Sequence, residues 1–163
     1  MVSAVALSPE LAGREQQPGA ATAMLLADGR LHLHHGPIDL VIGAEGPQDA
    51  VNHAFDVAIT RFKTILDELV CELDLLRLPL CETSCRPDGD VAARMWAATA
   101  CHANHYKADN YITAMAAVAG AVADEILTLM CNSVDLDRAY VNNGGDIALF
   151  LSSEAASPQQ FSI

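Results

Sequence analysis

The sequence has few aromatic residues and few basic ones. Aromatic side chains make up 5% of the chain, so the core has to be built mainly from Ala, Val, Leu and Ile. Nine Lys and Arg residues stand against 21 Asp and Glu residues, which gives a formal net charge of -12. Because such a surface repels phosphate backbones and anionic lipid headgroups, the composition argues against nucleic-acid binding and against adsorption to a membrane.

The sequence also lacks a long apolar run, the features of a secretory leader in its first residues, and an even number of cysteines. The longest apolar run, from Ile112 to Ala123, is shorter than the ~20 residues that a membrane-spanning helix needs. Residues 1–13 have neither the basic start nor the apolar stretch of a signal peptide. Five cysteines are an odd number, in a chain too large to depend on disulfides. We therefore expect a cytoplasmic protein with reduced thiols.

What the chain does have is enough apolar material for one folded domain. Apolar residues make up 52% of the 163 residues and charged residues 18%, a balance typical of a globular domain and not of a disordered chain. Residues 1–20 and 152–163 show no periodicity. We predict one domain over residues 21–151, between a flexible N-terminal tail and an irregular C-terminal tail.

The hydrophobic pattern predicts strands first, then helices, then strands again. Strands are expected over residues 23–27, 31–33, 38–42, 138–141 and 147–151, with Asp28-Gly29 as a tight hairpin turn between the first two. Apolar residues at steps of three and four predict one long helix over residues 48–76, and further helices are expected over 91–104 and 113–130. This order favours an α+β fold, an antiparallel sheet packed with long helices, over a doubly wound sheet.

The turn Asn142-Asn143-Gly144-Gly145-Asp146 is the first candidate site. Two glycines permit backbone angles that other residues resist, and they leave N–H groups uncovered. Such a turn can donate to an anion or to the carbonyl oxygens of a ring, and Asp146 could accept a hydrogen bond or hold a metal. The alternative is a simple hairpin turn, for which Asn-Gly is a common sequence.

The first half of the helix expected over residues 113–130 is the second candidate. It carries small apolar side chains on nearly all sides and includes Gly120, so another backbone or a ligand can approach it closely. Thr113 is expected to be its N-cap, and the N-terminus of a helix is an anion-binding position. The alternative is a core helix that packs on a sheet.

Histidines and cysteines give weaker signals. Cys81 and Cys85, followed by His102 and His105, loosely resemble zinc-ligand spacing, but unrelated surface residues are the preferred interpretation and no metal site is predicted. His32 and His34 alternate along a strand and should share a face. The sequence contains no nucleophile elbow, P-loop or dinucleotide-binding fingerprint.

Three segments carry a resemblance to a known family. They are Ala116-Ala117-Val118-Ala119-Gly120-Ala121-Val122-Ala123-Asp124, Tyr140-Val141-Asn142-Asn143-Gly144-Gly145-Asp146-Ile147-Ala148 and His35-Gly36-Pro37-Ile38-Asp39-Leu40. Over about residues 22–151 the chain resembles an uncharacterised family, UPF-0280, which is related to the ApbE flavin transferases.

The resemblance implies a T-fold-like α+β architecture and a flavin site. ApbE proteins use FAD and a divalent metal, expected to be magnesium, to attach FMN to a threonine of a partner protein. By resemblance, Asn143, Gly144, Gly145 and Asp146 line the flavin pocket, with Asp124 near it.

Two departures from the ApbE pattern change that expectation. The ApbE helix has a lysine before its glycine, whereas Ala119 precedes Gly120 here. ApbE proteins also place metal-binding acidic and threonine residues in a C-terminal half that has no counterpart here, so we expect an incomplete, half-length version of the fold.

These observations leave three functional hypotheses. The first is an ApbE-like protein that binds FAD or FMN or transfers FMN, in active or degenerate form. The second is a T-fold role in pterin or one-carbon cofactor biosynthesis, which rests on fold analogy alone. The third is a non-catalytic domain that exposes an apolar sheet edge and pairs with a partner or with itself as a homo-oligomer.

Overall fold

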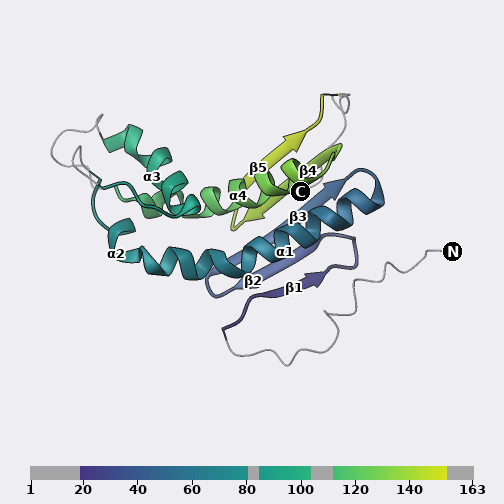
Figure 1. Cartoon of the computed structure of the whole chain (residues 1–163), viewed down its shortest axis with the longest axis horizontal. Helices are drawn as coiled ribbons and strands as arrows, with labels where there is room; N and C mark the ends of the chain where they lie inside the picture. The colour runs from purple at the N-terminus through teal and green to yellow at the C-terminus, as the bar shows by residue number, and fades with distance from the viewer. Residues whose placement is uncertain (1–18, 81–84, 104–111, 154–163) are drawn as a thin grey trace.

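The computed structural model describes residues 19–80, 85–103 and 112–153. These residues form five β-strands, four α-helices and one short 3-10 helix (Figure 1). In chain order the elements are β1 (Thr22–Leu25), β2 (Leu31–His35), β3 (Ile38–Glu45), α1 (Gln48–Cys71), α2 (Leu73–Leu76), α3 (Asp90–Ala103), the 3-10 helix η2 (Ala114–Ala117), α4 (Val118–Ser133), β4 (Arg138–Asn143) and β5 (Asp146–Leu151).

The strands form one antiparallel sheet in the order β1-β2-β3-β4-β5. The pairing of β3 with β4 joins the three N-terminal strands to the two C-terminal strands. In this pair Glu45 lies opposite Arg138 toward one end of the sheet, and Leu40 lies opposite Asn143 toward the other end. Every helix of the described residues lies between these two strands in the sequence. The predicted α+β class, with an antiparallel sheet packed with helices, is confirmed.

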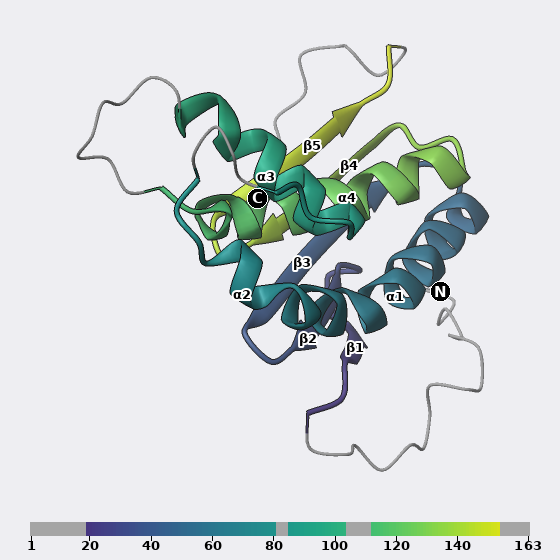
Figure 2. The same ribbon diagram turned by 60° about the vertical axis from the view of Figure 1, so that its left-hand side comes forward.

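The helices lie on one face of the sheet. The helices α1 and α4 lie side by side against the strands, and α3 packs on α4 and η2 farther from the sheet (Figures 1 and 2). No described helix covers the other face, which we call the open face. Along β2, buried and half-exposed residues alternate, because successive side chains point to opposite faces of a strand.

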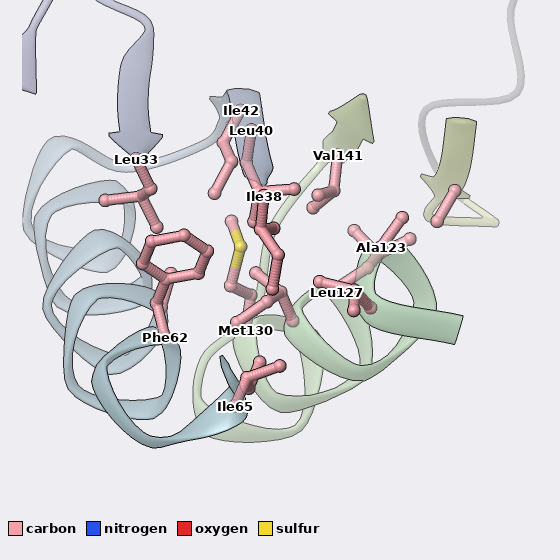
Figure 3. Packing of buried hydrophobic residues seen from close by; sticks show 14 of the residues in the cluster. Leu33, Ile38, Leu40, Ile42, Phe62, Ile65, Ala123, Leu127, Met130 and Val141 are labelled. Carbon is pink, nitrogen blue, oxygen red and sulfur yellow. The ribbon is translucent and has the colours of Figure 1, made fainter. Parts of the chain in front are cut away.

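The core lies between the sheet and the helices α1 and α4. Figure 3 shows aliphatic side chains of the strands meeting one aromatic ring, Phe62, and the aliphatic side chains of both helices. The residues labelled there are Leu33, Ile38, Leu40 and Ile42 from β2 and β3, Val141 from β4, Phe62 and Ile65 from α1, and Ala123, Leu127 and Met130 from α4. With few aromatics to fill space, the sheet and the helices are held together mainly by branched aliphatic residues.

The predicted helix over residues 48–76 is two helices. Its continuity ends at Glu72, which has φ -107° and ψ 9°. The Glu72 carboxylate accepts hydrogen bonds from the backbone N–H groups of Asp88, at 2.8 Å, and Gly89, at 3.0 Å. These contacts hold the start of α3 against the end of α1, and the hydrophobic period alone does not reveal the break.

The predicted helix over residues 113–130 begins with a 3-10 turn and ends later than expected. Ala117, with φ -110° and ψ 12°, separates η2 from α4. By length and apolar composition, Ala114–Ser133 could cross a membrane. In this fold, however, α4 buries a face that includes Val122, Ile126 and Met130 against the sheet and α1, as the core helix of a globular domain does.

Candidate functional site

The sequence from Asn142 to Asp146 forms a two-residue hairpin turn between β4 and β5. Asn143 and Asp146 are the last paired residues. Gly144 has φ +61° and Gly145 has φ +107°, both in the left-handed region that favours glycine. The Asn142 side chain closes the turn, since its Oδ1 accepts a hydrogen bond from the Gly145 N–H at 3.0 Å. The hairpin interpretation is therefore correct, and it does not exclude a ligand.

The turn lies directly against the first turn of α4. Asn143, which is 8% exposed, donates from Nδ2 to the carbonyl oxygen of Ala119 at 3.1 Å. Asp146 approaches the same helix, because its Oδ2 lies 3.8 Å from the position that a Cβ atom at Gly120 would take. Two segments more than twenty residues apart in the sequence thus meet, and the turn is not an isolated tip of the molecule.

The two glycines of the turn are open to solvent. A Cβ atom built at Gly144 or Gly145 would meet no other atom within 4 Å. The positive φ angles, and not crowding, account for glycine at these positions. An exposed carboxylate, that of Asp146, stands beside this bare backbone at the positive end of the α4 dipole. Because the Gly145 N–H is bonded to Asn142, the turn can offer a ligand the Gly144 N–H as a donor and the Asp146 carboxylate as an acceptor.

Thr113 and Asp124 make neither of the two contacts that join the turn to α4. Thr113 is the N-cap of η2 without a side-chain capping bond, and it pairs with Pro79 in an isolated β-bridge. The residue that caps α4 is Ala117, so the predicted capping role of Thr113 is wrong: the 3-10 turn intervenes. Asp124 is exposed, four residues after Gly120, which places it one turn farther along the same side of α4.

A partly buried ion cluster joins the three long helices, and sequence analysis missed it. Glu125 of α4 is 6% exposed and accepts a hydrogen bond from Arg61 Nε of α1 at 2.9 Å and another from Arg94 Nη2 of α3 at 3.1 Å. Arg61 also donates from its two terminal nitrogens to the carboxylate of Glu68, at 2.6 and 2.7 Å. The hydrogen bonds from Arg61 lower the pKa of Glu68 below its usual value.

No local pattern in the sequence reveals this cluster. Arg61 and Glu68 are seven residues apart on one helix, but Glu125 and Arg94 lie on other helices. One feature of the sequence could have indicated the cluster: Glu125 interrupts the apolar pattern of α4 at a buried position. A buried carboxylate in such a position requires cationic partners.

A second polar group lies on the open face of the sheet. Asp39 of β3 contacts His32 Nε2 at 3.0 Å through Oδ1 and His34 Nδ1 at 3.1 Å through Oδ2. Partial burial acts to raise the pKa of Asp39, but the hydrogen bonds to His32 and His34 outweigh it and leave that pKa below its usual value. The expectation that the two histidines share a face is confirmed.

No metal site emerges among the residues that the structure describes. There, no group of three His, Cys, Asp or Glu side chains is arranged to hold an ion. In the loose zinc pattern, Cys81 and His105 lie outside the described residues, whereas Cys85 and His102 are exposed.

One surface hollow lies at the opposite end of the sheet from the turn. It is lined by the β1–β2 turn, the β3–α1 connection and the first half of α1, including Asp28, Glu45, Gly46 and Phe55. Glu45 pairs with Arg138 at the end of the sheet away from Asn143. Two of the carboxylates that line the hollow already form ion pairs, Asp28 with Arg30 and Glu45 with Arg138. The hollow and the predicted site are therefore separate features.

Comparison with known proteins gives a family and no closer relative. No curated protein and no solved structure matches the chain. A family model described as AbpE bacteria matches residues 23–159, well over half of the chain. The match includes all of the sheet except Thr22, the first residue of β1, together with both helices of the core and the hairpin turn at Gly144 and Gly145. The chain belongs to the AbpE bacteria family.

Proposed function

We propose that the β4–β5 turn and the first turn of α4 form a binding site for a flavin nucleotide, as in an ApbE-like protein of the cytoplasm with a T-fold-like sheet. One observation carries the proposal: the segments that resemble ApbE proteins are in contact, through Asn143 and Ala119 and through Asp146 and Gly120. The third such segment ends at Leu40, which is opposite Asn143. All three therefore meet at one end of the sheet.

The residues present fit the polar edge of a flavin better than they fit a metal. The bare backbone at Gly144 suits a ring carbonyl oxygen, and the Asp146 carboxylate suits a ring N–H or a ribityl hydroxyl group. A magnesium ion needs several oxygen ligands, and Asp146 is a single carboxylate. The proposal therefore concerns flavin binding, and it assigns no transfer step to these residues.

Gly120 supplies independent support. A Cβ atom there would meet Asp146 Oδ2 at 3.8 Å, an ordinary contact, so packing does not require glycine. Glycine inside a helix costs about 0.5–1 kcal/mol relative to alanine. A ligand that approaches the helix backbone at residue 120 would explain why glycine stands there in place of alanine.

Titration of the protein with FAD and with FMN, with and without magnesium, tests the proposal. Binding is expected to quench flavin fluorescence. Gly120→Ala and Asp146→Asn should each weaken binding at least tenfold, while Asp56→Asn, which removes an exposed carboxylate from α1, should leave it unchanged. Gly120→Ala should also raise the thermal stability of the unliganded protein, which separates lost binding from lost folding.

Two outcomes would overturn the proposal. One is the absence of flavin binding at high micromolar concentration. The other is binding that Gly120→Ala and Asp146→Asn leave intact, because the flavin would then sit elsewhere. A pterin that binds in place of either flavin would move the assignment to the pterin or one-carbon alternative.

A further inference from the structure

In the described part of the chain, the strand β5 is an edge of the sheet that carries no charge beyond its first residue. It pairs with β4 on one side, and no described strand lies on its other side. Natural edge strands are usually guarded by lysine, proline, a bulge or an inward-pointing charge. The sequence of β5, DIALFL, contains no lysine and no proline, and its register with β4 runs without a bulge.

The open-face side of β5 is also apolar. Ile147, Leu149 and Leu151 point to this face and are 38%, 56% and 57% exposed. They make up half of the large exposed hydrophobic side chains in the described part of the chain; the others are Met24, Val70 and Leu78. Three exposed apolar side chains at alternate positions of an edge strand form a continuous apolar strip, a feature that marks contacts with other protein chains.

The distribution of charge makes this edge the approach at which a second copy of this chain is repelled least. The protein carries a net charge of -12, so two copies repel each other over most approaches. Asp146, at its first residue, is the only charged residue in β5. Two copies can therefore approach along this edge without bringing rows of carboxylates together.

The sequence of β5 is complementary to itself in one antiparallel register. We propose that β5 pairs with β5 of a second copy about a two-fold axis at Leu149, which makes one continuous ten-stranded sheet. In this register Leu149 faces its own counterpart, and Ile147 faces Leu151 of the second copy. All three exposed side chains then form cross-strand apolar pairs on the same face.

The same register keeps the acidic residues apart. Asp146 lies opposite Ser152 of the second copy and not opposite its Asp146. A register centred on Ala148 would instead place Ile147 opposite Leu149 and leave Leu151 unpaired. The axis at Leu149 is thus the one that pairs every exposed apolar residue of the strand.

Sedimentation velocity of the full chain and three matched variants tests the pairing. Leu149, Met24 and Val70 are each 56% exposed, so a lysine at any of them should be compatible with folding. The wild type is expected to be a dimer and Leu149→Lys a monomer. Met24→Lys, on the same face at the opposite edge, and Val70→Lys, on α1, should remain dimers.

Cross-linking supplies a second measurement that does not depend on disruption. Leu149→Cys should form a disulfide with its own counterpart under mild oxidation, identified by peptide mapping against the native cysteines. A wild-type monomer at all concentrations would overturn the proposal. So would a dimer that Leu149→Lys leaves intact, or one that Met24→Lys disrupts equally, because the contact would then not be the β5 edge.

Discussion

At the residue scale, the tightest requirement in the sheet is Gly43 beneath the ring of Tyr140. A Cβ atom at Gly43 would lie 2.3 Å from Tyr140 Cε1 and 2.8 Å from Cζ. The ring lies across the backbone of β3 and is buried although it sits on the open face. Since Tyr140 must move to admit a methyl group, Gly43→Ala should destabilise the protein by about 1–3 kcal/mol in chemical denaturation.

The matched control is the same substitution in a Tyr140→Ala background. Without the ring, a methyl group at residue 43 has room, so the cost of Gly43→Ala should fall well below its cost in the wild type. A double-mutant cycle measures this difference. Equal costs in both backgrounds would show that the strand conformation at residue 43, and not the ring, requires glycine.

The residues of the candidate site were predictable in kind but not in position. A two-glycine turn after a strand predicts positive φ angles, and Gly144 and Gly145 have them. The sequence could not show that Asn143 reaches the carbonyl oxygen of Ala119, because that contact depends on the packing of α4 against β4 and β5. Thr113 was misplaced for a related reason: helix periodicity does not distinguish a 3-10 turn from the first turn of an α-helix.

At the element scale, the Glu125 carboxylate holds three helices together. Its removal in Glu125→Ala leaves Arg61 without one of its two acidic partners and Arg94 without this contact. Breaking a buried ion pair by removing one partner typically costs about 3–5 kcal/mol, because the remaining charge stays desolvated. We expect a loss in that range, toward its lower end because Arg94 is partly exposed, measured by urea denaturation.

Glu68→Ala is the matched comparison, since it removes the other carboxylate bound to Arg61. Glu68 is more exposed than Glu125, and exposed ion pairs contribute about 0–1 kcal/mol. The loss for Glu68→Ala should therefore be clearly smaller. If the two losses were equal, burial of Glu125 would not be the source of its effect.

The pH dependence of stability follows from the same cluster. Hydrogen bonds from Arg61 hold the pKa of Glu68 below its ordinary value of 4.5. A carboxyl group whose folded pKa is depressed contributes stability above its unfolded pKa and loses it as pH falls through the folded pKa. The wild type should thus lose more stability below pH 4.5 than Glu68→Gln does, in urea titrations at a series of pH values. Parallel curves would contradict this.

The elements themselves were largely readable from the sequence. The turn sequence Asp28-Gly29 predicted a hairpin between two strands, and β1 and β2 lie on either side of it. The periodic spacing of Val51, Phe55 and Phe62 predicted a helix, and all three lie in α1. The break at Glu72 was not predicted. It coincides with a pair of hydrogen bonds from the loop before α3 to the Glu72 carboxylate, which local sequence does not show. Local sequence specifies an element, whereas a contact from elsewhere in the chain decides where it ends.

At the scale of the whole molecule, the one-sided fold leads to the proposed dimer. The helices cover one face of the sheet, and the open face includes the apolar row on β5. The periodicity of residues 147–151 predicted a strand, but it could not show that this strand lies at an edge. That position follows from the pairing of β4 with β3 on one side and β5 on the other.

The net charge of -12 predicts how the dimer responds to salt. Two copies repel each other over distances beyond the contact itself, and the repulsion is screened over about 10 Å at 0.1 M ionic strength. The β5 contact is apolar, so salt weakens no attractive ion pair within it. The dimer should therefore dissociate more readily at low ionic strength and tighten as sodium chloride is added, in sedimentation measurements at fixed protein concentration. A dimer that weakens with added salt would be held by ion pairs, and the apolar row on β5 could not be its main contact.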